Sequence, residues 1–170
     1  MILPDNFRTL VITLSDRAYS GEYEDLSGPA IKKILDDYFN DIGWKMESEI
    51  MIIPDDVSML RQIINESSQS FHVIVTTGGT GIGPKDFTVD VVTDLLDKEI
   101  PGIMELIRVK YGMEKPNALL SRGVAGIKDI SLIYTLPGSV KAVKEYMSEI
   151  LKTLQHAIYM QYGIDVHKKH

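Results

Sequence analysis

Residues 73–90 contain the strongest chemical signal in the sequence, a glycine-rich turn followed closely by a cation and an acid. The turn reads Gly78-Gly79-Thr80-Gly81, and Lys85 and Asp86 come after it. Backbone N–H groups in such a turn can hold phosphate, and the amino end of a following helix adds positive potential. A cation and a carboxylate beside the turn suit a phosphate that carries a divalent metal.

Two familiar phosphate-binding motifs do not account for this turn. A P-loop needs Gly-Lys-Ser/Thr after four residues from its first glycine, whereas Gly78 leads to Gly83-Pro84. The dinucleotide fingerprint needs Gly-x-Gly-x-x-Gly, and the run from Gly79 to Gly83 is one residue short. A glycine turn without a ligand is therefore an open alternative, and Lys85 and Asp86 favour the phosphate interpretation.

Small polar or acidic residues follow four apolar runs that are typical of buried strands. These runs lie within residues 9–14, 44–53, 71–75 and 131–136. In a parallel sheet, ligands bind beyond the carboxyl ends of the strands. We therefore expect four clusters to converge at one edge: Ser15-Asp16-Arg17, Asp55-Asp56, Gly78-Gly79-Thr80-Gly81 and Pro137-Gly138-Ser139.

Helical spacing of apolar residues separates the strands. Helices are expected to begin near Ser27, Val57, Thr88, Ile103 and Ser139, with Ser27, Thr88 and Ser139 as caps. Residues 18–26 are expected to form a loop. The alternation of strands and helices indicates an α/β fold with a mostly parallel sheet covered on both faces. A β-hairpin over residues 118–136 would add an antiparallel strand.

The composition limits the classes of protein to consider. A chain of 170 residues fits a single domain over residues 1–170. The net charge of −6 argues against nucleic acid as a partner, so an anionic substrate must be met by local N–H groups and a few cations. The absence of cysteine excludes disulfides and thiol nucleophiles and fits a reducing cytoplasm. No apolar stretch approaches membrane-spanning length.

Several of the polar residues also have simple structural interpretations. Asp55 and Ser139 could cap helices, and Asp16 with Arg17 could be a surface turn pair. Asp86, on the same predicted edge as Asp55, favours a functional role, because two carboxylates there could hold Mg²⁺ between phosphate oxygens. The acidic group Glu22, Glu24 and Asp25 is expected to be a solvated loop. His72, within a strand, is expected to be a hydrogen-bonded or edge histidine and not a catalytic base.

Several motifs occur in the order found in one known family. They are Ser15-Asp16-Arg17-Ala18-Tyr19-Ser20-Gly21, Gly78-Gly79-Thr80-Gly81 with Lys85, Asp86 and Thr88, Leu119 with Ser121 and Arg122, and Leu136-Pro137-Gly138-Ser139. Together they resemble the molybdopterin adenylyltransferase family of the MogA/MoaB type, which also forms the G domain of gephyrin-like proteins. The resemblance extends from about residue 10 to about residue 162.

The resemblance implies a three-layer α/β/α fold and a homotrimer. It implies transfer of AMP from Mg-ATP to molybdopterin, giving adenylylated molybdopterin and pyrophosphate. Asp55 and Asp86 match the family's two essential acids and would place Mg²⁺. The glycine turn would hold phosphate, Lys85 would offset its charge, and Ser121 and Ser139 would contact the pterin or its phosphate. The full set of expected substrate-binding residues is Ser15, Asp16, Arg17, Gly78, Gly79, Thr80, Gly81, Lys85, Thr88, Ser121, Pro137, Gly138 and Ser139.

The match has departures. The family often has Arg where this chain has Lys85, which keeps the charge but not a bidentate phosphate contact. Proline is common at the positions of Val89 and Val140, in the first turns of helices, where it is tolerated but not obligatory. None of these changes removes a reactive group.

Two other functions are compatible with the same fold, a non-catalytic molybdopterin-binding protein and a nucleotide pyrophosphatase. The retained pair of acids favours the transferase. The trimer would use apolar residues after Pro101, with Ile103, Leu106 and Ile107 as the candidate contacts. A transient contact with a molybdate-inserting MoeA-type protein is a further expectation from the resemblance.

Overall fold

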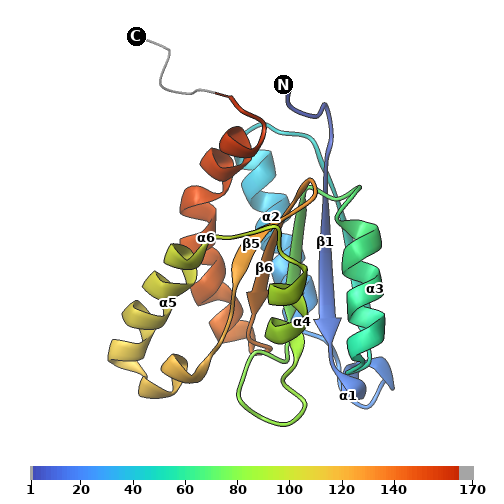
Figure 1. Cartoon of the computed structure of the whole chain (residues 1–170), viewed down its shortest axis with the longest axis vertical. Helices are drawn as coiled ribbons and strands as arrows, with labels where there is room; N and C mark the ends of the chain where they lie inside the picture. Colours follow the sequence, from blue (N-terminus) through green and yellow to red (C-terminus); the bar gives the residue numbers. More distant parts are fainter. Residues whose placement is uncertain (1, 165–170) are drawn as a thin grey trace.

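A six-stranded sheet runs through the middle of the molecule and carries helices on both faces (Figure 1). The computed structural model describes residues 2–164, so the ends of the expected domain, residue 1 and residues 165–170, lie outside the described residues. The strands are β1 (Phe7–Leu14), β2 (Met46–Ile53), β3 (Val73–Thr77), β4 (Lys98–Glu99), β5 (Ala125–Lys128) and β6 (Ser131–Leu136). Their order in the sheet is β2-β1-β3-β6-β5-β4.

Four neighbouring strands, β2, β1, β3 and β6, are parallel, and they end level with one another. Leu14 pairs with Ile53 across β1 and β2, and Thr77 pairs with both Thr13 and Leu136. The residues that follow these strands therefore emerge side by side at one edge of the sheet. β5 runs antiparallel to β6 and completes the predicted hairpin.

The helices are α1 (Asp16–Tyr19), α2 (Ser27–Asp41), α3 (Val57–Ser67), α4 (Thr88–Leu95), α5 (Pro101–Glu114) and α6 (Val140–Gln161), with a 3₁₀ helix, η1, at Pro116–Leu120. Helices α2, α5 and α6 bury apolar residues in one cluster with the sheet, and α3 and α4 do so on the other face. The mostly parallel α/β sandwich predicted from the sequence is confirmed. Within the described part of the chain, no helix has the length and apolar content needed to cross a membrane.

Three short elements differ from the sequence-based expectations. Residues 16–19 were expected within polar, loop-forming sequence but form α1, because the Ser15 side chain accepts a hydrogen bond from the N–H of Ala18. Residues 98–99 form β4 on the open edge of β5. Residues 116–120 form η1 instead of part of the hairpin, because Pro116 restricts the backbone at its start. Strand β3 begins at Val73, so His72 lies just before the strand and not inside it.

The amino end of α2 is capped by the side chain of Asp25, one position before the N-cap residue Leu26, and not by Ser27 as expected. Asp25 Oδ1 accepts hydrogen bonds from the N–H groups of Ser27 and Gly28 at 3.1 and 3.0 Å and from the Ser27 hydroxyl. Its Oδ2 accepts a bond from the Thr13 hydroxyl at 2.7 Å, which joins the helix to β1. The prediction of a solvated Asp25 was therefore wrong, because this carboxylate satisfies the free N–H groups of a helix start.

The other two expected caps have different outcomes. Ser139 caps α6, since its side chain accepts a hydrogen bond from the N–H of Ala142. Thr88 lies inside the first turn of α4, and Phe87 occupies the cap position without a side-chain bond. The Thr88 hydroxyl therefore does not cap α4.

The apolar surface of α5 differs from the expected one. Ile107 is buried in the core, so it was wrongly assigned to the surface, and Ile103 is partly buried. Leu106 is exposed as expected, together with Val109 and Met113. The helix faces the core with Met104 and Ile107, a spacing of three residues that puts both on one face.

Replacing Asp25 by alanine should lower the free energy of unfolding by about 1–2 kcal/mol, because the α2 amino end and Thr13 lose their shared acceptor. Urea denaturation followed by circular dichroism measures the change. The matched control is Glu24→Ala, which alters an exposed neighbouring acid and should stay within about 0.5 kcal/mol of the original. Equal stability of the two variants would contradict the capping role.

Candidate functional site

The four predicted clusters do meet at one edge of the sheet. The N–H of Ser15 donates to Ile53 O at 3.0 Å, and the N–H of Gly78 donates to Leu136 O at 3.0 Å. The hydroxyl of Thr77 donates to Pro137 O at 3.0 Å, which ties the ends of β3 and β6 together. In Figure 1 the arrowhead of β1, α1 and the loop before α4 lie at the same, lower end of the molecule.

The glycine turn has a geometry that requires glycine at its first two positions. Gly78 and Gly79 have φ angles of +100° and +65°, in the region that side chains disfavour. A Cβ on Gly78 would lie 2.5 Å from Leu14 O, and one on Gly79 would collide with Thr88 Oγ1. The turn is therefore packed tightly between the end of β1 and the start of α4.

Asp86 folds back over the second half of the turn. Its Oδ2 accepts a hydrogen bond from the N–H of Gly83 at 2.8 Å. A Cβ on Gly81 or Gly83 would approach the same oxygen to 2.7 or 2.9 Å. These two glycines thus make room for a carboxylate, and that carboxylate lines the cavities on both sides of the turn.

A second group of charges lies between α1 and the end of β2. Lys85 Nζ is 2.8 Å from Asp16 Oδ2, and the N–H of Asp55 donates to Asp16 Oδ1 at 2.9 Å. The Lys85 ammonium holds the pKa of the Asp16 carboxyl below its usual value, and Asp16 in turn raises the pKa of Lys85. These residues line a cavity of about 340 Å³ together with Ser15, Arg17, Gly79 and Asp86.

Two structural alternatives for these acids are excluded by the contacts. The cap of α3 is Asp56, whose Oδ1 accepts from the N–H of Met59 at 2.7 Å, so Asp55 is not needed as a cap. Asp16 pairs with Lys85 and not with Arg17, whose guanidinium lies 5.5 Å from the centre of the Tyr23 ring. Asp55 therefore lines the cavity without acting as a helix cap.

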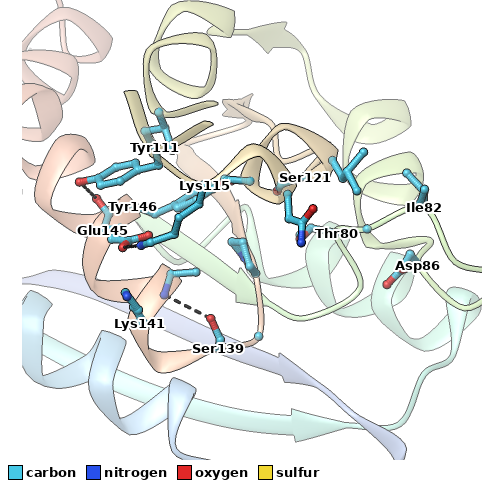
Figure 2. Close-up of a pocket in the computed structure, with 18 of the residues that line it drawn as sticks. Thr80, Ile82, Asp86, Tyr111, Lys115, Ser121, Ser139, Lys141, Glu145 and Tyr146 are labelled. Carbon is cyan, nitrogen blue, oxygen red and sulfur yellow. Dashed lines mark hydrogen bonds and ion pairs between the residues drawn. The ribbon is translucent and has the colours of Figure 1, made fainter. Parts of the chain in front are cut away.

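Of the three cavities that meet at this edge of the sheet, the largest, of about 610 Å³, extends from the glycine turn to the space between α5, η1 and α6. Figure 2 shows Asp86 and Ile82 at one end, Thr80 and Ser121 near the middle, and the Tyr111, Lys115, Glu145 and Tyr146 group at the other end. Lys115 Nζ contacts Glu145 Oε1 at 2.5 Å across this end. The cavity thus joins a loop rich in N–H groups to an aromatic and cationic region.

A third cavity, of about 370 Å³, lies on the other side of Gly138 and Ser139. Arg17, Tyr23 and Asp25 contribute to its wall, together with Ser15 and Gly78. Gly138 and Ser139 line this cavity and the largest one, while Gly79 and Asp86 line the largest and the smallest. Ligands in adjacent cavities would therefore meet at the glycine turn.

Two hydroxyl groups in this region are buried without a hydrogen-bond partner among the described residues. They are Thr88 Oγ1, below Gly79, and Ser121 Oγ, in the wall of the largest cavity. Buried hydroxyls are normally satisfied, so such groups call for a ligand or water. Thr88 is the one expected site residue that lines none of the three cavities, since its side chain is covered by the turn.

The sequence-based analysis missed the far end of the largest cavity. Tyr111, Lys141, Glu145 and Tyr146 come from helices whose spacing indicated only packing, and Lys115 follows the end of α5. The i, i+4 separation of Lys141 and Glu145 places this pair on one face of α6, a signal that required knowing which segment lies opposite that face.

His72 does not belong to the site. Its Nδ1 accepts a hydrogen bond from the N–H of Arg8 at 2.9 Å, which confirms the expected structural role. Burial lowers the pKa of the imidazole below its usual value. The position before β3, at the end of the strand opposite to the glycine turn, separates it from the cavities.

The residues present fit a Mg²⁺ ion that is shared with a substrate. In the described part of the chain, no cluster of three or more His, Asp or Glu side chains is arranged to hold a metal by itself. Asp55 and Asp86 line one cavity, and Mg²⁺ commonly takes one or two carboxylates with phosphate and water oxygens. The two acids could therefore supply part of the ligand set of a Mg²⁺ ion, with the remaining oxygens coming from a substrate and water.

The fold is that of an α/β protein with cavities at the carboxyl ends of its parallel strands, and solved structures match it over most of the chain. The tungsten cofactor synthesizing protein MoaB from Pyrococcus furiosus matches with a TM-score of 0.81 and 35% identity, covering 94% of this chain and 99% of that one. A family model described as a probable molybdopterin binding domain matches residues 10–156. The chain belongs to this molybdenum cofactor biosynthesis family.

Curated relatives agree with that assignment. The molybdopterin adenylyltransferase of Helicobacter pylori is 33% identical over 155 residues, which cover 90% of this chain and 86% of the relative. Gephyrin of Dictyostelium discoideum is 37% identical over 155 residues, which cover 87% of this chain. The match spans about a fifth of that gephyrin, 21% of its length.

The carboxyl of Asp16 should titrate below the usual range for aspartate, because Lys85 and the N–H of Asp55 stabilise its charged form. The depressed pKa means that this contact stabilises the edge above the ordinary pKa of aspartate and is lost as the pH falls through the lowered value. Carboxyl ¹³C NMR measures the titration. In Lys85→Met the pKa of Asp16 should rise, while Lys33→Met, far away on α2, should leave it unchanged. An unshifted Asp16 pKa in Lys85→Met would contradict the pair.

Proposed function

We propose that this protein transfers AMP from Mg-ATP to molybdopterin in the cytoplasm, giving adenylylated molybdopterin and pyrophosphate. The observation that carries the proposal is the position of Asp55 and Asp86, which share a cavity at the glycine turn where a second, larger cavity begins. Two anionic substrates could reach one point from two sides there. The relatives named molybdopterin adenylyltransferase support the choice of substrates.

In the proposed reaction, a terminal phosphate oxygen of molybdopterin attacks the α-phosphorus of ATP. The new P–O bond joins AMP to the pterin phosphate, and the bond between the α-phosphorus and its bridging oxygen breaks to release pyrophosphate. The substrate supplies the nucleophile, so the protein has to align two anions and offset the charge that develops. This fits a site without a Ser–His–acid arrangement among the described residues.

The proposed roles follow from the contacts. Asp55 and Asp86 would hold Mg²⁺, which when bound would offset charge on the phosphate oxygens. The N–H groups of the glycine turn would bind phosphate. Lys85, which pairs with Asp16 in this structure, would leave that carboxylate and pair with the substrate phosphate. Ser121 Oγ, buried without a partner among the described residues, would accept or donate a hydrogen bond to the pterin side. Ser15, Arg17, Gly138 and Ser139 would line the second substrate's cavity, and Pro137 would line the largest one.

The runner-up is a protein of the same family that binds molybdopterin without chemistry. Two carboxylates beside an anion-binding turn weigh against it, because like charges weaken anion binding unless a metal is present. A nucleotide pyrophosphatase is less well supported, since the largest cavity would have no assigned ligand.

Pyrophosphate release from Mg-ATP, measured with and without molybdopterin, tests the proposal. We expect release that depends on both the pterin and Mg²⁺, with adenylylated molybdopterin as the second product. Binding of the pterin without release would indicate the non-catalytic protein. Release from ATP without the pterin would indicate the pyrophosphatase.

Substitutions at Asp86 and Gly79 should separate turnover from binding. Asp86→Ala should lower turnover by a factor of roughly 10² or more, because a preorganised charge is lost, with pterin affinity kept or improved. Asp86→Asn retains an oxygen that can accept from the N–H of Gly83. A loss of turnover equal to that of Asp86→Ala would therefore show that the negative charge matters, and not the conformation of the loop. Gly79→Val should instead damage binding, because its φ of +65° and the Thr88 contact leave no room for a side chain. Normal turnover of Asp86→Ala with normal pterin binding would refute the assignment.

We also propose a homotrimer, supported by the exposed apolar residues Leu106, Val109 and Met113 on α5. A transient contact with a MoeA-type molybdate-inserting protein would follow transfer, since the adenylylated product needs a consumer. Light scattering should report three times the chain mass, and Leu106→Glu should reduce it. A monomer at all concentrations would reject the trimer.

A further inference from the structure

Arg122, the residue after Ser121, holds three carbonyl groups of the glycine turn and its extension. Its backbone N–H donates to Thr80 O at 2.9 Å, and its Nε donates to Gly81 O at 2.8 Å. Its Nη2 donates to Asp86 O at 2.6 Å. One residue from a distant part of the chain therefore fixes the carbonyl direction at three points along this loop.

Those carbonyl directions determine where the next N–H groups point. The described residues contain no cis peptide bond, and in a trans peptide the C=O and the following N–H point in opposite directions. With the carbonyls of Thr80 and Gly81 turned toward Arg122, the N–H groups of Gly81 and Ile82 point away from it. Neither N–H donates to an acceptor among the described residues, and both residues line the largest cavity.

The guanidinium is itself held in place by Asp90, in the first turn of α4. Arg122 Nη1 lies 2.8 Å from Asp90 Oδ1, and Nη2 lies 2.9 Å from Asp90 Oδ2, a bidentate pair. The Arg122 side chain also lowers the pKa of Asp90. A planar guanidinium can serve a carboxylate and two carbonyls at once, whereas a lysine ammonium on a flexible stem cannot reproduce this geometry.

We propose that Arg122 is a positioning residue, which turns the Gly81 and Ile82 N–H groups toward the phosphate of the substrate by holding the preceding carbonyls away from it. The identity of the ligand as a phosphate rests on the proposed function. Arg122 itself lines none of the three cavities and does not touch the reacting atoms. Its contribution is the orientation of two neutral donors, which adds to the charge that Lys85 supplies.

Titration with inorganic pyrophosphate, followed by ¹H–¹⁵N NMR, tests the inference without any requirement for turnover. In the unaltered protein the Gly81 and Ile82 amide signals should shift on addition of pyrophosphate. In Arg122→Lys those two shifts should be lost or strongly reduced, and the affinity for pyrophosphate should fall about tenfold, or about 1.4 kcal/mol. Because lysine keeps the positive charge, this loss would assign the effect to geometry.

The matched control is Arg61→Lys, which changes another half-exposed arginine paired with a carboxylate of α4, Asp94, at 2.7 Å. It should keep both amide shifts and the affinity. Asp90→Asn keeps Arg122 but removes the charge that orients it, and should give a smaller loss in the same two amides; it serves as the test if Arg122→Lys does not fold.

Two outcomes would overturn the inference. One is an absence of Gly81 and Ile82 shifts with pyrophosphate in the unaltered protein. The other is an Arg122→Lys variant with unchanged shifts and affinity. These results are distinct from failure of the proposed function: a protein that shows the expected shifts and the Arg122→Lys loss, but forms no adenylylated molybdopterin, would retain the inference and lose the transferase.

Discussion

The level ending of four parallel strands is the constraint on which the rest of this structure depends. Thr77 of β3 pairs with Thr13 on one side and Leu136 on the other, so three chain segments reach the edge at the same height. A shift of one strand by a single residue would turn its side chains to the opposite face and separate the clusters. The approach of Gly78 to Leu14 O shows how little space the arrangement leaves. The position of the site thus depends on the register of the strands, and the individual side chains act within the space that this register sets.

Under the proposed function, a chain with a net charge of −6 has to bind anions. Local groups provide the attraction: N–H groups of the glycine turn, Lys85, and the Lys115 and Lys141 side chains at the far end of the largest cavity. Several acids near these groups already have a partner, as Asp16 has Lys85 and Asp90 has Arg122. Among the described residues, Asp55 and Asp86 have no cationic partner of this kind, and under the proposed function they would face the ligand through a metal.

The features that depend on apolar periodicity and on strand ends could be predicted from the sequence. The features that depend on contacts between side chains distant in the sequence could not. Apolar spacing identified the parallel strands, the hairpin and the long helices, and parallel pairing then placed the four clusters together. The cap of α2 was assigned to Ser27, since the bond between Asp25 and Thr13 depends on how the loop returns to β1. Ile107 was placed on the surface because its helix alone does not reveal which face meets α6. The hydrogen bonds from Arg122 to the glycine turn join residues about 40 positions apart, so no local sequence pattern predicts them.

The order of strands in the sheet also has a consequence for how the protein reaches its native state. β3 lies between β1 and β6, and each residue of β3 pairs with residues that are roughly 60 positions away along the chain on either side. Such long-range parallel pairings form slowly, because loop closure costs entropy before the contacts form. The glycine turn has no fixed counterpart in a partly folded chain, since its carbonyls are held only when Arg122, in the segment after η1, is in place. A phosphate ligand would therefore recognise the completed fold alone, and its binding would shift the folding equilibrium toward the native protein.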